Sequence, residues 1–132
     1  FTVIDDCYNA NPVSMKAGID LLCMADTDTV AILGDMFELG TNELALHEEV
    51  GTYAAQKAVG HIICVGELSR RMYEGAIGQH AGSSTTYFRT REELLAALKK
   101  SREELIPEGS TVLVKASHGM KFSEVVEYLG SC

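Results

Sequence analysis

The feature that most constrains this chain is a fivefold alternation of short strand-like segments with helical segments. The strand-like segments are rich in β-branched residues and run apolar without alternation, which is typical of strands covered on both faces. They span residues 2–5, 29–33, 61–65, 85–88 and 111–115. Because strand–helix units with right-handed crossovers build parallel sheets, the sequence predicts an α/β fold, with an open parallel sheet and helices on both of its faces.

Helical spacing of apolar residues follows every strand-like segment. The first helix is expected to begin at Pro12, with Asn11 as its N-cap, and the fourth opens with a capping box that starts at Thr90. The third helix, from position 68 to about 77, is the weakest because it carries glycines at positions 75 and 78. The apolar stripes of the other helices are Met15, Ile19, Leu22 and Cys23; Leu46, Val50, Tyr53 and Ala54; Leu94, Leu95 and Leu98; and Phe122, Val125, Val126 and Leu129.

Length and composition limit the possible functions. The chain has 132 residues, 46% of them hydrophobic, which corresponds to one domain with a proper core. A formal net charge of −8 argues against nucleic acid or an anionic membrane as the main partner. No apolar run approaches the roughly 18 residues that span a bilayer, and no signal peptide is recognisable.

The cysteines, at positions 7, 23, 64 and 132, form no CxxC pair and are not grouped with the histidines. This pattern predicts reduced thiols in a cytoplasmic protein and no zinc site. The chain also lacks an initiator Met and opens inside a strand pattern. We therefore expect it to be a fragment of a longer protein.

Ligands of open parallel sheets bind beyond the carboxyl ends of the strands, so those ends hold the candidate site residues. The first strand runs into Asp5-Asp6-Cys7-Tyr8-Asn9. A carboxylate there can accept a hydrogen bond from a ribose, hold a metal or pair with an arginine. Tyr8 offers a flat face on which a base can stack. We therefore predict a binding role for this turn.

The second and fifth strands end in groups of opposite charge. Asp35 and Glu38 follow the second strand and can receive an ammonium group, with an acidic solvated loop as the alternative. Lys115 and Ser117 follow the fifth strand beside a helix N-terminus, which suits a carboxylate or phosphate; the alternative is a snorkelling lysine and a serine cap. Together these groups predict a zwitterionic ligand. A lone helical histidine such as His47 is more often packed than catalytic.

The runs DDCYNANPVSM at 5–15, LGDMFELG at 33–40, HEEVG at 47–51 and VLVKAS at 112–117 are similar to the C-terminal domain of the Mur ligases. The resemblance covers the whole chain in order, and it is to the branch that joins D-alanyl-D-alanine to UDP-N-acetylmuramoyl-tripeptide. It implies a Rossmann-like three-layer sandwich with a mostly parallel sheet of five or six strands. It also implies a single domain over 1–132, with the UDP-binding and ATPase domains absent from the chain.

In such ligases ATP phosphorylates the precursor's terminal carboxylate, and the dipeptide amine then attacks the acyl phosphate to give the amide, ADP and phosphate. The resemblance places Asp6 at the ribose of ATP, with Tyr8 and Asn9 beside the nucleotide. The residues that it places towards the dipeptide are Asp35, Lys115 and Ser117. It implies no catalytic residue and no metal ligand in this domain alone. ATP and magnesium would be bound mainly by the absent central domain of a bacterial, cytoplasmic, monomeric enzyme.

The sequence departs from the family pattern in two places, and two other functions are alternatives to the ligase. His118 stands where many relatives carry arginine, which makes it a weaker and pH-dependent cation. No GxxxxGK[ST] motif is present, so the isolated domain is expected to be inactive. A receiver-like phospho-accepting domain would need an aspartate after the third strand, where Val65-Gly66-Glu67 stands instead. A non-catalytic nucleotide- or peptide-binding module is the other alternative.

Overall fold

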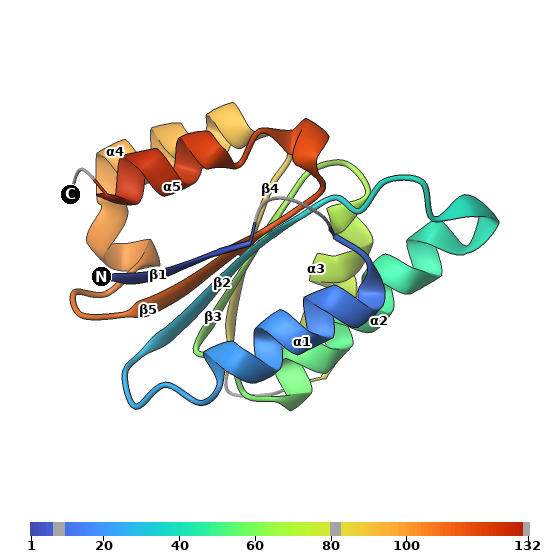
Figure 1. Cartoon of the computed structure of the whole chain (residues 1–132), viewed down its shortest axis with the longest axis horizontal. Coiled ribbons are helices and arrows are strands. Elements are labelled where there is room, and N and C mark those ends of the chain that lie inside the picture. The colour runs from blue at the N-terminus through green and yellow to red at the C-terminus, as the bar shows by residue number, and fades with distance from the viewer. Residues whose placement is uncertain (7–9, 80–82, 131–132) are drawn as a thin grey trace.

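The computed structural model describes residues 1–6, 10–79 and 83–130. Within those residues its sheet holds five strands, all paired in parallel, in the order β1-β5-β2-β3-β4 (Figure 1). The strands are β1 Thr2–Asp6, β2 Thr29–Gly34, β3 His61–Val65, β4 Ser84–Phe88 and β5 Thr111–Lys115. All the strand predictions are therefore confirmed to within one residue at each end.

Helices cover both faces of this sheet. Helices α1, α2 and α3 lie on one side, and α4 and α5 lie on the other (Figure 1). Their bounds are α1 Pro12–Leu22, α2 Glu43–Gln56, α3 Ser69–Ile77, α4 Arg91–Leu105 and α5 Ser123–Gly130, with short 3₁₀ turns at Gly40–Asn42 and His118–Met120. The predicted α/β, Rossmann-like three-layer arrangement is confirmed.

Two apolar layers hold the helices to the sheet. Ile19 and Leu33 belong to the layer under α1, α2 and α3, whereas Ile32 and Phe122 belong to the layer under α4 and α5. Successive residues of a strand point to opposite faces, so a strand covered on both faces is apolar throughout. Full burial of one such side chain contributes about 1.5–3 kcal/mol.

Both predicted N-caps are present. The Asn11 side-chain oxygen accepts a hydrogen bond from the Ser14 backbone N–H at 2.9 Å, and Pro12 occupies the first helical position. The Thr90 hydroxyl oxygen accepts from the Glu93 backbone N–H at 3.1 Å. Each cap contributes about 1 kcal/mol and sets where its helix begins after the preceding strand.

Helices α2 and α3 approach each other closely at two glycines. A Cβ atom on Gly51 would lie 1.9 Å from the carbonyl oxygen of Met72, and one on Gly75 would lie 2.3 Å from that of Glu48. Gly75, which lowers the helical propensity of the third segment, is therefore required by packing. The helical periodicity of the sequence does not show this close contact between α2 and α3.

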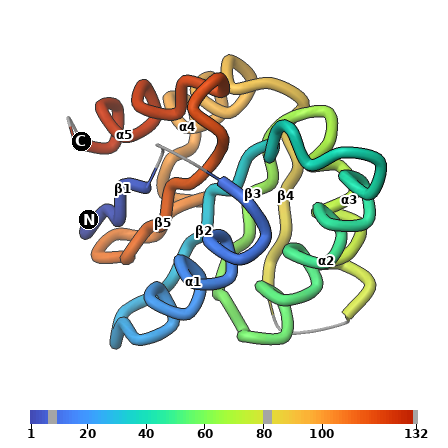
Figure 2. The backbone as a smooth tube through the Cα atoms, turned by 45° about the vertical axis from the view of Figure 1, so that its right-hand side comes forward, coloured from blue at the N-terminus to red at the C-terminus, as the bar shows by residue number. Residues whose placement is uncertain are grey.

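The strand order separates this fold from a receiver domain. Receiver-like and flavodoxin-like folds have the order 2-1-3-4-5, with the first strand inside the sheet. Here β1 is an edge strand and β5 lies between β1 and β2 (Figure 2). The structure therefore does not favour the receiver alternative.

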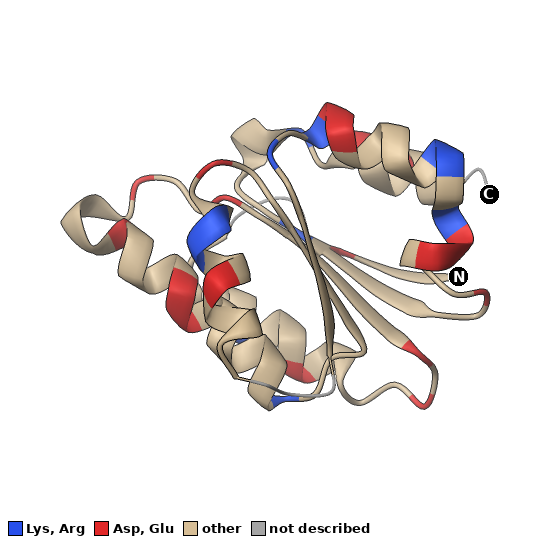
Figure 3. Cartoon of the chain, turned by 180° about the vertical axis from the view of Figure 1, so that it is seen from behind, with Lys and Arg blue, Asp and Glu red and all other residues tan. Residues whose placement is uncertain are grey.

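Charged residues lie on the helices of both layers (Figure 3). Over the whole chain, 19 acidic residues outnumber 11 lysines and arginines.

Candidate functional site

Strand β5 marks the position where a ligand site is expected. Its neighbours β1 and β2 lead into α1 and α2 on one face of the sheet, whereas β5 leads into α5 on the opposite face (Figures 1 and 2). The chain therefore diverges beyond the carboxyl ends of these three strands. Ligands of open α/β sheets bind at such topological switch points. The predicted site residues Asp6, Asp35, Lys115 and Ser117 all lie at these three strand ends.

The structure brings Asp6 and Lys115 into direct contact. They are partners in the parallel register of β1 and β5, and Lys115 Nζ lies 2.5 Å from Asp6 Oδ2. The Lys115 side chain is 1% exposed, whereas that of Asp6 is 47% exposed. The cation is thus buried behind a carboxylate that still faces solvent. Asp5, which precedes it on the strand, points to the other face of the sheet.

The loops after β2 and β5 are hydrogen-bonded to each other. The backbone N–H of Ser117 donates to the backbone oxygen of Asp35 at 3.0 Å, and the backbone N–H of Phe37 donates to Ser117 Oγ at 2.8 Å. Ser117 makes no side-chain cap bond to the turn that follows it. Its hydroxyl therefore accepts from the neighbouring loop and keeps its own proton to donate.

The Asp35 carboxylate points towards the start of α3. It is buried, and its Oδ1 accepts hydrogen bonds from the backbone N–H of Ser69 at 2.8 Å and from the Ser69 hydroxyl at 2.7 Å. Gly66, at φ +119°, leaves room for this carboxylate, because a Cβ atom there would lie 2.3 Å from Oδ1. Contact between Asp35 and a substrate ammonium remains a prediction. The structure adds that the same carboxylate caps a helix.

Only one of the two glycines that bound this loop has an unusual backbone angle. Gly40 has φ +84°, a conformation that glycine adopts more readily than other residues. Gly34 is a strand residue without a positive φ. It is small because a Cβ atom would lie 2.7 Å from both the Ala116 and Phe122 side chains.

His47 is a packed residue. It is fully buried, its Nε2 accepts a hydrogen bond from the Met36 backbone N–H at 2.9 Å, and its Nδ1 lies 2.6 Å from the Glu43 carbonyl oxygen. These partners require the tautomer that carries its proton on Nδ1. His47 therefore fastens the loop after β2 to helix α2, as the more common role of a helical histidine predicts.

The remaining candidates are exposed or lie outside the described residues. Glu38 is exposed with φ +62°, and His118 is exposed in the turn after β5. Tyr8 and Asn9 lie outside the described residues, so their predicted place beside the nucleotide remains a prediction.

Tyr87 and Ser69 border the site, although sequence analysis did not single them out. The Tyr87 hydroxyl donates to the Gly66 carbonyl oxygen at 2.8 Å. Burial raises the pKa of Tyr87, and the nearby charge of Asp35 raises it further. The available signals were a serine at the start of a predicted helix and a tyrosine near a strand end, which are both too common to identify a site.

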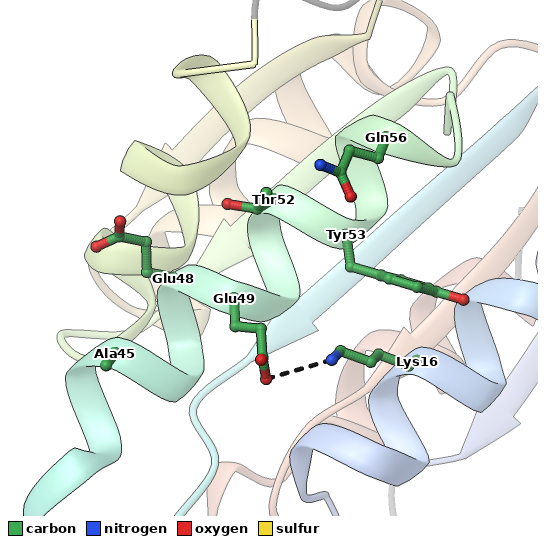
Figure 4. A pocket seen from close by; sticks show the side chains of 7 residues that line it. All are labelled: Lys16, Ala45, Glu48, Glu49, Thr52, Tyr53 and Gln56. Atoms are coloured by element: carbon green, nitrogen blue, oxygen red, sulfur yellow. Dashed lines mark ion pairs between the residues drawn. The ribbon is translucent and has the colours of Figure 1, made fainter.

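A separate open hollow of about 450 Å³ lies between α1 and α2 (Figure 4). Lys16 and Glu49 form an ion pair of 3.2 Å across it, and the Lys16 ammonium lies 5.5 Å from the centre of the Tyr53 ring. These side chains come from the outward faces of two helices rather than from strand ends. An exposed pair of this kind contributes at most about 1 kcal/mol and identifies no ligand.

The described residues 1–6, 10–79 and 83–130 contain no group of three or more His, Cys, Asp or Glu side chains placed to hold a metal ion. No helix in the same residues is long and apolar enough to cross a membrane. Cys23 and Cys64 are free thiols, and burial raises the pKa of both.

Comparison with known proteins identifies relatives over almost the whole chain. The chain is 33% identical over 130 residues to the UDP-N-acetylmuramoyl-tripeptide–D-alanyl-D-alanine ligase of Bacillus subtilis, covering 97% of this chain and 28% of that protein. It is 37% identical over 145 residues to the protein of the same name from Mycobacterium tuberculosis CDC 1551, with 97% and 28% covered. The chain thus spans little more than a quarter of these relatives.

Solved structures share the fold. A crystal structure of MurF from Acinetobacter baumannii matches 98% of this chain and 28% of its own, with a TM-score of 0.86 and 31% identity. MurF ligase from Thermotoga maritima, solved in complex with ADP, matches 95% of this chain and 27% of its own at a TM-score of 0.74 and 22% identity, which supports the fold alone.

A family model supports the same assignment. The model described as "Mur ligase, glutamate ligase domain" matches residues 1–118. This match covers most of the chain, including every strand of the sheet and the Asp6–Lys115 pair. The chain therefore belongs to the Mur ligase family, as its glutamate ligase domain.

Proposed function

We propose that this chain is the C-terminal domain of an ATP-dependent ligase that joins D-alanyl-D-alanine to UDP-N-acetylmuramoyl-tripeptide in peptidoglycan precursor synthesis. ATP would transfer its γ-phosphoryl group to the tripeptide carboxylate, releasing ADP. The dipeptide amine would attack the acyl phosphate, form the amide and release phosphate. The observation that carries the proposal is the match, over almost the whole chain, to relatives that bear this one name.

The nucleotide half of the proposed site is built on the end of β1. Asp6 is half exposed, and only its Oδ2 is taken up by the ion pair with Lys115. Its Oδ1 is placed to accept a hydrogen bond from a ribose hydroxyl, because a carboxylate carries two acceptor oxygens. We place Tyr8 and Asn9 beside the same nucleotide, as the family resemblance implies. Magnesium would be held by the central domain of the parent enzyme.

The dipeptide half of the proposed site lies at the joined loops after β2 and β5. The Ser117 hydroxyl has a proton to donate to a carboxylate. The Asp35 carboxylate, whose Oδ1 accepts hydrogen bonds from Ser69, is proposed to face the dipeptide amine. The sequence also predicts that Lys115 faces the dipeptide, whereas its buried contact with Asp6 favours a role in the nucleotide half of the site.

Within this proposal the domain completes a reaction site instead of forming one. It carries no GxxxxGK[ST] phosphate-binding motif anywhere in its 132 residues. The isolated chain should therefore neither hydrolyse ATP nor make product. Closure of the domain over the other two would exclude water and bring the dipeptide to the acyl phosphate.

Steady-state kinetics of the complete ligase that carries this domain test the proposal. Asp6→Asn should raise the KM for ATP about tenfold, since it replaces a charged hydrogen-bond acceptor by a neutral one. Ser117→Ala should raise the KM for D-alanyl-D-alanine about tenfold, since it removes a hydrogen bond to a charged group. Asp26→Asn, an exposed change of the same type, is the control. A parent enzyme that forms no amide from these substrates, or full activity of both variants, would contradict the proposal.

A further inference from the structure

We propose that Lys115 is a positioning residue for the nucleotide half of the site. Its ammonium group holds the Asp6 carboxylate in place and does not receive the dipeptide carboxylate. This inference rests on the proposed function, because it assigns Lys115 to one of the two substrates of that reaction.

The first support is the path of the Lys115 side chain. A Cβ atom on Gly18 of α1 would lie 3.5 Å from Lys115 Cδ and 3.3 Å from the Leu113 side chain. The stem of Lys115 therefore runs beneath α1, in line with the apolar Leu113, before it reaches Asp6. A lysine held in this way has its direction fixed by packing, unlike a lysine that extends from the surface.

The second support is burial. Lys115 is 1% exposed, and its Nζ is in contact with Asp6 Oδ2 at 2.5 Å. A buried cation without a compensating charge is strongly unfavourable, so this contact is part of the folded state. A dipeptide carboxylate would have to displace Asp6, which is attached to the adjacent strand and so competes at a high effective concentration.

The third support is the exposure of Asp6. Its side chain is 47% exposed and it is the last residue of β1, directly before the turn for which nucleotide binding is proposed. One carboxylate oxygen is anchored from beneath by Lys115, so the direction of the other is restricted. Restricting the acceptor before the ligand arrives lowers the entropy cost of binding. Lys115 therefore affects the nucleotide through Asp6.

The test is a double-mutant cycle in the complete ligase, with Lys115→Met, Asp6→Asn and the double variant. Lys115→Met should raise the KM for ATP about tenfold, and the double variant should be no worse than Asp6→Asn alone, because the two residues act as one unit. The KM for D-alanyl-D-alanine should stay within about twofold. Lys115→Arg, which keeps the cation, should recover part of the loss, and Lys100→Met, an exposed change, is the control.

Four outcomes overturn the inference. The first is a raised KM for the dipeptide with an unchanged KM for ATP in Lys115→Met, as expected if Lys115 bound the dipeptide. The second is an additive effect in the double variant. The third is an unchanged KM for ATP in Asp6→Asn, which contradicts the nucleotide role of Asp6 and with it that of Lys115. If Lys115→Met does not fold, Lys115→Arg replaces it, and a raised KM for the dipeptide with an unchanged KM for ATP in that variant is the fourth. A parent enzyme that forms no amide contradicts the proposed function itself, on which the assignment of Lys115 rests.

Discussion

Lys115 Nζ lies 2.5 Å from Asp6 Oδ2, so a fully buried cation on a central strand is neutralised by a half-exposed carboxylate on the edge strand beside it. The pair sits at the carboxyl ends of β1 and β5, where the chain diverges to opposite faces of the sheet. It therefore belongs both to the fold and to the candidate site. Substitutions of its two members are expected to have unequal effects on stability.

Asp6→Asn should destabilise the isolated domain more than Lys115→Met does. Removing the carboxylate takes away the negative group in contact with a buried ammonium, which costs about 3–5 kcal/mol when both partners are buried, and we expect the lower end of this range because Asp6 is half exposed. Replacing the lysine by an apolar side chain of similar volume leaves no buried charge. Urea unfolding of the two variants and of Asp26→Asn measures the difference. A smaller loss for Asp6→Asn than for Lys115→Met would contradict this account.

His47→Ala should lower the free energy of unfolding by about 3 kcal/mol. The buried backbone N–H of Met36 loses its acceptor, and the removed ring leaves a cavity between the loop and α2. His47→Gln should lose less, because it keeps an acceptor on a side chain of similar reach. The exposed change Gln56→Ala on the same helix should stay within about 0.5 kcal/mol. Equal stability of His47→Ala and Gln56→Ala in urea unfolding would show that the contact contributes nothing.

The fold could be predicted from the sequence because its signals are local. A β-branched run, a cap such as Asn11 and the helical spacing that follows are read within about twenty residues of chain, and each was found where expected. The candidate site was predicted only as a set of strand ends. Which side chains face each other depends on contacts between distant segments. The bond from Ser69 to Asp35 and the pairing of Asp6 with Lys115 are of this kind.

Two glycines also show that contacts between distant segments cannot be predicted from local sequence. Helical periodicity treats Gly75 as a weakness, and the sequence pattern does not explain why position 34 is a glycine. Both are small because a neighbouring segment comes close: the Glu48 carbonyl for Gly75, and the Phe122 ring for Gly34. These constraints come from tertiary packing, and the local sequence around each glycine carries no signal of that packing.

Gly51→Ala should destabilise the domain by about 2 kcal/mol or more. The added methyl group would lie 1.9 Å from the Met72 carbonyl oxygen, and the α2–α3 contact has to open to admit it, which outweighs the gain of about 1 kcal/mol in helix propensity. Gly130→Ala is the matched control, since among the described residues nothing outside its own helix backbone and chain neighbours lies within 4 Å of the added methyl group. It should be neutral or slightly stabilising. Thermal unfolding of the two variants measures the difference. Equal melting temperatures would contradict the close α2–α3 contact as the reason for Gly51.

His61 should make the domain less stable as the pH falls below about 6.5. Burial lowers the pKa of His61, and the hydrogen bond from its ring to the Leu105 carbonyl only partly opposes this shift. The unfolded chain therefore binds a proton at a higher pH than the folded domain does, so stability rises with pH between the two pKa values. The contribution of neutral His61 to the free energy of unfolding is fully present above the pKa that His61 has in the unfolded chain. It is lost as the pH falls through the pKa that His61 has in the folded domain. Urea unfolding of wild type and His61→Gln between pH 7.5 and 5 measures it.

The expected result is a stability difference between wild type and His61→Gln that shrinks as the pH falls through this window. Gln56→Ala, an exposed change that involves no titratable group, is the control and should keep the pH dependence of the wild type. The ring of His61 lies between two partners, with Nδ1 2.9 Å from the Leu105 oxygen and Nε2 2.8 Å from the Thr86 hydroxyl. Protonation forces the Thr86 hydroxyl to reverse its role from donor to acceptor. A difference between the two proteins that is constant from pH 7.5 to 5 would mean that the His61 ring takes up its proton equally well in the folded and unfolded states.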